Sequence, residues 1–108
     1  MITQKKEKYL FLKYFNMDLN KEKKNIDVNW KLKQKSISRD FKFENFKQAL
    51  DFMNKVGKFC ETINHHPNWY NAYNVVKIEL TTHDLGGLSN LDFKLAKKID
   101  SIYNSFGK

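Results

Sequence analysis

The side chains best suited to proton transfer gather in one short stretch of the sequence. The chain contains three histidines, and His65, His66 and His83 all lie within a span of 19 residues. Imidazole has an ordinary pKa of about 6.5, so it can donate or accept a proton close to neutral pH. We therefore expect metal-free acid–base chemistry on a small polar ligand here, with a non-catalytic role as the alternative.

The spacing is less suited to a metal site, a nucleophilic cysteine or a nucleotide loop. Neighbouring residues in an extended chain face opposite sides, so His65 and His66 seldom bind one ion, and no His-x-x-x-His spacing occurs. Cys60 falls on the apolar face of a predicted helix, where we expect a small buried side chain. The pair Gly86-Gly87 matches neither nucleotide-binding fingerprint. No metal and no cofactor are therefore expected.

A helix and a strand are predicted to position the histidines. Asn45 can cap a helix, with Gln48 three residues later as in a capping box. Apolar residues then recur at spacings of three and four over about five turns: Phe46, Ala49, Leu50, Met53, Val56, Cys60 and Ile63. Because this helix must end before Pro67, His65 and His66 follow its C-terminus.

The clearest strand of the sequence precedes Gly86-Gly87. Alternation predicts it over residues 76–83, with Val76, Ile78 and Leu80 facing the core and His83 on the polar side. A strand end and a helix end that converge form a pocket from two rigid elements. We expect the three histidines to meet there.

The remaining elements complete an α+β pattern. Alternation predicts strands at Trp30–Leu32 and over residues 37–43, and a turn over residues 71–74. A last helix begins at Ser89, with Asp92 in capping-box position. Its buried residues are Leu95, Ile99, Ile102, Tyr103 and Phe106, before Gly107 ends it. The order predicts a four-stranded antiparallel sheet with two to three helices packed on one face.

Length and composition are typical of one globular domain. The chain has 108 residues, of which 41% are hydrophobic and 15% aromatic, so it can bury a modest core. No apolar stretch is long enough to cross a membrane, and no secretory signal is evident. A single cysteine excludes an internal disulfide, so a cytoplasmic location is expected, with a nuclear location as the alternative.

The positive charge is concentrated before residue 48. Residues 1–47 contain 13 Lys and Arg against 6 Asp and Glu, whereas the two kinds nearly balance in residues 48–108. We interpret this as a solvated basic surface and do not expect nucleic acid as a partner. Residues 1–29 are predicted to be a variable basic segment before a domain over residues 30–108. Within that segment, residues 9–15 could form a helix or a strand, and residues 16–29 a loop or linker.

These motifs together resemble the pterin-4a-carbinolamine dehydratase family. The matching blocks are Glu61-x-x-x-His65-His66-Pro67-x-Trp69, then Tyr73-Asn74-x-Val76-x-Ile78-x-Leu80-Thr81-Thr82-His83, and then Gly87-Leu88-Ser89-x-x-Asp92 with Leu95-Ala96. The upstream matches are Trp30, Ile37-x-Arg39-x-Phe41-x-Phe43-x-Asn45-Phe46 and Ala49. The resemblance covers residues 30–106, and three separated blocks in the right order make it specific.

The resemblance implies a dehydratase that eliminates water from 4a-hydroxytetrahydrobiopterin during tetrahydrobiopterin recycling. The hydroxyl leaving C4a needs a proton from an acid, a ring N–H must lose a proton, and the N5 lone pair supplies the push. The product is the quinonoid dihydropterin. Positioned acid–base groups typically contribute about 10²–10⁴-fold to such a reaction.

The same resemblance implies roles for individual residues. His65, His66 and His83 are expected to be catalytic, with His65 and His83 transferring protons from opposite sides of the ring and His66 orienting it. Glu61 is expected to orient a histidine and Trp69 to shape the wall. The residues expected to bind substrate are Glu61, Asn64, Trp69, Thr81, Thr82 and Asp84. Those expected to support the site structurally are Pro67 and Asp92.

The resemblance also leaves other roles open. Animal relatives serve as dimerisation cofactors of a homeodomain transcription factor, so a non-catalytic binding module is the alternative, and a pterin-related role such as molybdopterin metabolism is a third. The three retained histidines favour catalysis. A homodimer or homotetramer without membrane contact is expected. Cys60 and Asn64 stand where family members often have Ala and an acidic residue.

Overall fold

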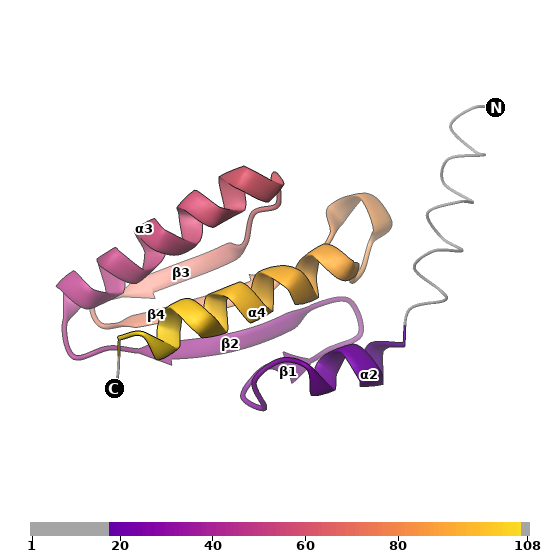
Figure 1. The fold of residues 1–108 in the computed structure, drawn as a ribbon, viewed down its shortest axis with the longest axis horizontal. Coiled ribbons are helices and arrows are strands. Elements are labelled where there is room, and N and C mark those ends of the chain that lie inside the picture. The colour runs from indigo at the N-terminus through magenta and orange to yellow at the C-terminus, as the bar shows by residue number, and fades with distance from the viewer. Residues whose placement is uncertain (1–17, 107–108) are drawn as a thin grey trace.

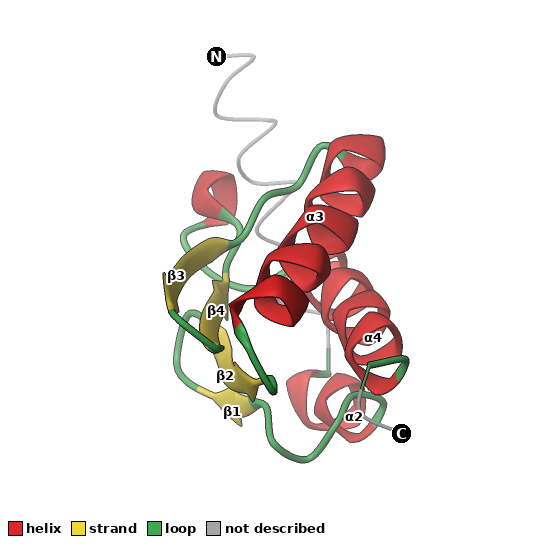
Figure 2. Ribbon diagram, turned by 90° about the vertical axis from the view of Figure 1, so that its left-hand side faces the viewer, coloured by secondary structure: helices red, strands yellow, loops and turns green. Residues whose placement is uncertain are grey.

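Helices cover one face of a four-stranded antiparallel sheet, which confirms the predicted α+β fold (Figures 1 and 2). The structure, a computed structural model, describes residues 18–106. Its elements are α2 (Leu19–Lys24), β1 (Lys31–Leu32), β2 (Ile37–Lys42), α3 (Phe46–Ile63), β3 (Asn68–Ala72), β4 (Val75–Leu80), the 3₁₀ helix η1 (His83–Leu85) and α4 (Asn90–Asn104). The strand order is β1-β2-β4-β3, and within residues 18–106 no helix is both long and apolar enough to cross a bilayer.

The two central strands supply the sheet's share of the core. Antiparallel pairing places Ile37 opposite Leu80 and Phe41 opposite Val76, and all four side chains are buried. The predicted alternation of β2 and β4 is therefore confirmed over these residues. Figure 2 shows α3 and α4 on the same side of the sheet, where their apolar residues close the core.

Helix α3 begins as predicted but packs through a slightly different stripe. The Asn45 side chain accepts a hydrogen bond from the Gln48 N–H at 2.9 Å, while Gln48 accepts from the N–H of Glu44 rather than from that of Asn45. The buried residues are Ala49, Phe52, Val56 and Cys60. The prediction that Phe46 and Leu50 face the core is wrong, because this stripe is centred on Phe52 and leaves both of them exposed.

Several local predictions also need correction. Residues 16–29 were expected to be a loop or linker, but Asp18 caps the short helix α2 with its side chain. Strand β1 contains only two residues at the sheet edge, so Leu32 is exposed instead of half-buried. Strand β3 continues to Ala72, which confines the turn to residues 73–74. The ambiguous residues 9–15 lie outside the described part of the chain.

The buried carboxylate of Asp100 on α4 pairs with Arg39 of β2 and also binds the segment before β1. One carboxylate oxygen of Asp100 accepts hydrogen bonds from Arg39 Nη1 at 2.6 Å and from Trp30 Nε1 at 2.7 Å. Its other oxygen accepts from the backbone N–H of Asp27 at 3.0 Å. The pKa of the Asp27 carboxyl is lowered below its ordinary value, mainly because the N–H of Asn29 donates to it. The charge of Arg39 lowers this pKa further, whereas burial acts in the opposite direction.

Candidate active site

The end of α3 delivers the first two histidines. Asn64 ends this helix in the left-handed conformation, with φ of 50° and ψ of 45°, and its N–H donates to the Cys60 carbonyl. Asparagine is one of the few residues other than glycine that adopt this conformation readily. The N–H of His65 donates to the same carbonyl at 3.2 Å, and Pro67 follows before β3 begins. His65 and His66 therefore follow the helix end, as predicted.

The third histidine stands on a short loop beyond β4. The strand ends at Leu80, and Thr82 pairs with Gly87 through an N–H···O bond of 2.8 Å. Gly86, with a φ of +65°, lies in the turn between the two bridged residues and reverses the chain there. His83 thus lies on the 3₁₀ helix η1 and not at a strand end, which corrects the predicted strand over residues 76–83. Its side chain is nevertheless exposed and outside the core, as expected.

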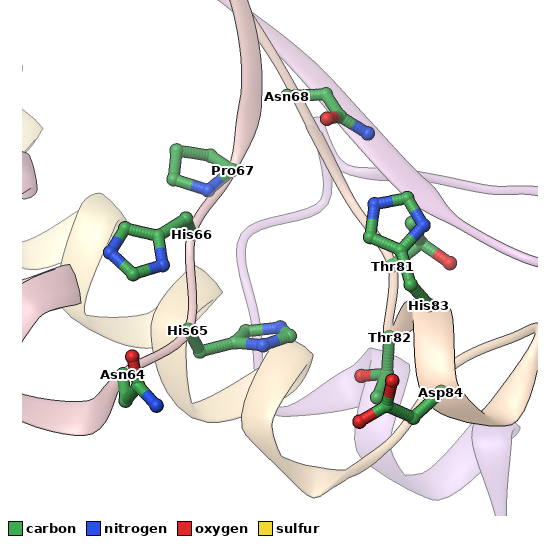
Figure 3. Close-up of a pocket in the computed structure, with 9 residues that line it drawn as sticks. All are labelled: Asn64, His65, His66, Pro67, Asn68, Thr81, Thr82, His83 and Asp84. Atoms are coloured by element: carbon green, nitrogen blue, oxygen red, sulfur yellow. The ribbon is translucent and has the colours of Figure 1, made fainter.

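The two segments form the walls of one cleft with a volume of about 300 Å³ (Figure 3). The lining residues are Asn64, His65, His66, Pro67, Asn68, Thr81, Thr82, His83 and Asp84. In Figure 3 the His65 ring extends toward the segment that carries Thr82 and His83, whereas the His66 ring extends to the other side. All three histidines therefore line one cleft, but only the His65 ring extends toward the wall that carries His83.

Two residues expected at the site lie outside the lining of this cleft. Trp69 on β3 pairs with Ile78 of β4, and its ring reaches toward Gly57 of α3. Trp69 is 39% exposed and is not part of the hydrophobic core. Glu61 instead contacts Nε2 of His66 with its carboxylate, and both side chains are exposed. A carboxylate therefore meets one of the histidines, in a position where solvent screens their charges.

Asp92 links the N-terminus of α4 to His65. Its buried carboxylate accepts the Ser89 N–H at 2.9 Å, which confirms the predicted capping box. The same oxygen accepts the Thr82 hydroxyl at 2.8 Å, and the other oxygen lies 2.6 Å from Nε2 of His65. The capping role could be predicted from local spacing. The contact with His65, which is 27 residues away, has no signature in the sequence.

The described residues provide neither a ready metal site nor a reactive thiol. No three His, Cys, Asp or Glu side chains between residues 18 and 106 are grouped as ligands for one metal ion. Cys60 is fully buried, and desolvation raises the pKa of its thiol to about 11. The thiolate is the nucleophilic form of cysteine, so Cys60 is unreactive near neutral pH.

Comparison with known proteins identifies relatives whose sequences match most of this chain. The sequence profile described as pterin 4 alpha carbinolamine dehydratase matches residues 15–102. A protein of Prochlorococcus marinus strain NATL2A, provisionally named a pterin-4-alpha-carbinolamine dehydratase, is 53% identical over 77 residues, which are 71% of this chain and 81% of the relative. A protein of Synechococcus sp. strain WH7803 with the same provisional name is 49% identical over 68% of this chain and 80% of its own length.

Solved structures agree with this result. The crystal structure of a transcriptional coactivator/pterin dehydratase from Brucella melitensis is 37% identical, with a TM-score of 0.75 over 79% of this chain and 92% of that chain. A pterin dehydratase-like protein described as a RuBisCO assembly factor in the alpha-carboxysome has a TM-score of 0.58 at 20% identity, over 68% of this chain and 86% of that one, which supports the fold alone. By its sequence profile and its relatives, this chain belongs to the pterin 4 alpha carbinolamine dehydratase family.

Proposed function

We propose that this protein eliminates water from a 4a-hydroxytetrahydropterin by acid–base catalysis in the histidine-lined cleft. The observation that supports this most strongly is the meeting of His65, His66 and His83 in one cleft, with a buried carboxylate behind His65. Family membership supports the same substrate class. The reaction would recycle the pterin that aromatic amino-acid hydroxylases use.

His65 is the proposed proton acceptor. An ionised carboxylate can only accept hydrogen bonds, so Nε2 of His65 donates its proton to Asp92 and leaves the lone pair on Nδ1. Within residues 18–106, Nδ1 has no hydrogen-bond partner and is not among the fully buried unpaired atoms, and His65 lines the cleft, which supports access to Nδ1 from there. A neutral imidazole held in this way can take a proton from a ring N–H of the pterin.

His83 and His66 complete the proposed reaction. His83 lies on the opposite wall and would protonate the hydroxyl that leaves C4a as water. The N5 lone pair then forms the C4a=N5 double bond, and the N–H proton passes to His65, so that the atoms balance. His66, in contact with Glu61, would orient the pterin. Asn64 and Asp84 of the cleft are proposed to bind its polar edge, as is Thr81 through its hydroxyl oxygen, because the proton of that hydroxyl is donated to the Lys35 carbonyl at 2.6 Å.

Single alanine variants test this division of roles. We expect His65→Ala and His83→Ala each to lower kcat by about 10²–10⁴-fold, and His66→Ala mainly to raise KM. Lys97→Ala, an exposed position on α4, is the surface control. The uncatalysed dehydration rate must be subtracted, because such a carbinolamine loses water slowly by itself. An unchanged kcat for His65→Ala or His83→Ala would remove that residue from the chemistry.

The same assay separates catalysis from a binding role. If the folded wild-type protein dehydrates the substrate no faster than buffer does, the proposed function is wrong and a binding module is favoured. A panel of pterins then tests the substrate class. The expected homodimer or homotetramer stays a prediction, which light scattering of the purified chain can test.

A further inference from the structure

Hydrogen bonds through two hydroxyl groups connect the first turn of α4 to the cleft. The N–H of Leu91 donates to Ser89 Oγ at 3.2 Å, and the hydroxyl oxygens of Ser89 and Thr82 lie 2.6 Å apart. Thr82 Oγ1 in turn donates to Oδ2 of Asp92 at 2.8 Å. The series therefore ends on the carboxylate that faces His65.

The direction of these bonds follows from the carboxylate at the end. An ionised carboxylate has no proton to give, and a hydroxyl has only one. Because Thr82 gives its proton to Asp92, the proton between the two hydroxyls must come from Ser89. Each donor thus points toward Asp92, whose Oδ1 stays available for Nε2 of His65 at 2.6 Å.

We propose that Thr82 is a positioning residue that acts on His65 through Asp92. Its hydroxyl keeps the carboxylate oriented so that His65 carries its proton on Nε2 and presents Nδ1 to the cleft. Thr82 was expected to bind substrate, but its only proton is already used inside the protein. The effect on the rate rests on the proposed function, whereas the effect on the His65 tautomer does not.

The burial of Asp92 makes this hydroxyl hard to replace. The carboxylate is fully buried, so water has no easy access to the position that a lost donor would leave. Without the Thr82 hydroxyl, Oδ2 keeps only the Ser89 N–H among the donors described here. Loss of one hydrogen bond to a charged group can lower a rate by about 10–100-fold. We therefore expect a decrease of this size in kcat when the Thr82 hydroxyl is removed.

The test compares Thr82→Val with Thr82→Ser and with the matched control Thr62→Val. Thr62 lies on α3 outside the cleft, and its hydroxyl donates to the Phe59 carbonyl, so this control removes an equivalent group elsewhere. We expect Thr82→Val to lower kcat by about 10–100-fold with little change in KM. Thr82→Ser should restore most of it, and Thr62→Val should match wild type.

Nitrogen-15 NMR of the histidine rings in the ligand-free protein gives the second readout. We expect the Nε2–H signature of His65 in wild type and Thr82→Ser, and its loss or mixing with the Nδ1–H form in Thr82→Val. An unchanged signature and kcat in Thr82→Val would overturn the proposal, and a raised KM alone would favour substrate binding by Thr82. A wild-type protein without dehydratase activity would refute the proposed function, while the NMR result would still decide the positioning role.

Discussion

Replacing Asp100 with alanine should remove a large part of the stability of this protein. Asp100 is the acceptor for Arg39 Nη1 at 2.6 Å, for Trp30 Nε1 at 2.7 Å and for the Asp27 N–H at 3.0 Å. The side chains of Arg39 and Asp100 are only 6% and 12% exposed. Asp100→Ala would therefore leave a buried guanidinium and two further donors without their main acceptor.

The size of the loss can be estimated from these contacts. Removing one partner of a buried ion pair costs about 3–5 kcal/mol, because the remaining charge stays desolvated. Arg39 would keep its position over the Phe41 and Tyr103 rings, at 4.6 and 5.2 Å from their centroids, and the more distant Asp27 carboxylate at 3.5 Å. We therefore expect a loss of about 4 kcal/mol from a total of roughly 5–15 kcal/mol.

Urea unfolding followed by circular dichroism measures this free energy. With an m-value of roughly 2 kcal/mol per molar urea, the midpoint should fall by roughly 2 M. Asp51→Ala is the matched control, since it breaks an exposed pair in which Lys47 is 85% exposed, and it should cost less than about 1 kcal/mol. The double variant Arg39→Met/Asp100→Leu should recover most of the loss, because neither charge is then buried alone.

Two results would refute this reasoning. If Asp100→Ala loses no more free energy of unfolding than Asp51→Ala, the buried pair is not stabilising in the way the contacts indicate. If the apolar double variant is as unstable as Asp100→Ala, the loss comes from altered packing or from the Trp30 and Asp27 donors, which lose their acceptor in both variants, and not from an unpaired charge.

Four further predictions concern the site, the core and pH. Asp92→Asn should lower kcat by about 10²–10⁴-fold in the dehydration assay, because the amide presents N–H groups to Nε2 of His65 and reverses its tautomer. Phe52→Ala should cost about 3–5 kcal/mol in urea unfolding, since this ring is fully buried. Cys60 should resist thiol reagents at pH 8 until urea is added. Burial raises the pKa of its thiol from 9.0 to about 11. The stability gained by burying the neutral thiol is therefore present below pH 9 and is lost as the pH rises through 11. The pKa of the Asp27 carboxyl is lowered in the folded protein, so the ionised carboxylate stabilises the fold at pH values above its ordinary pKa of 3.8. This stabilisation is lost as the pH falls through the pKa of the folded state. Asp27→Asn should therefore weaken the dependence of the urea midpoint on acid pH.

The parts of the fold that depend on local sequence were predictable. Asn45 and Ser89 both cap helices at the predicted residues, because the cap and its partner N–H lie within one turn of each other. The alternation of β2 and β4 was equally visible, since both strands have one buried face. The convergence of the two histidine-bearing segments was also predicted, although His83 lies on η1 beyond the end of β4.

The errors arise where tertiary contacts decide the structure. The exposure of Phe46 and the burial of Phe52 depend on how α3 rests on the sheet, which spacing alone does not specify. The end of β4 depends on the bridge between Thr82 and Gly87, which turns the chain before His83. The contact between Asp92 and His65 joins the first turn of α4 to the segment after α3, and these are close only in the folded protein.

The left-handed backbone at Asn64 restricts which side chains can occupy one position on the cleft wall. Asparagine, aspartate and glycine tolerate this conformation, whereas bulky or β-branched residues are strained in it. Evolution and protein engineers therefore have few options here, and Asn64→Asp is the change that adds a negative charge while keeping the shape. Selection at residue 64 can adjust the electrostatic preference of the cleft for its ligand, but it has little freedom to alter the cleft's width.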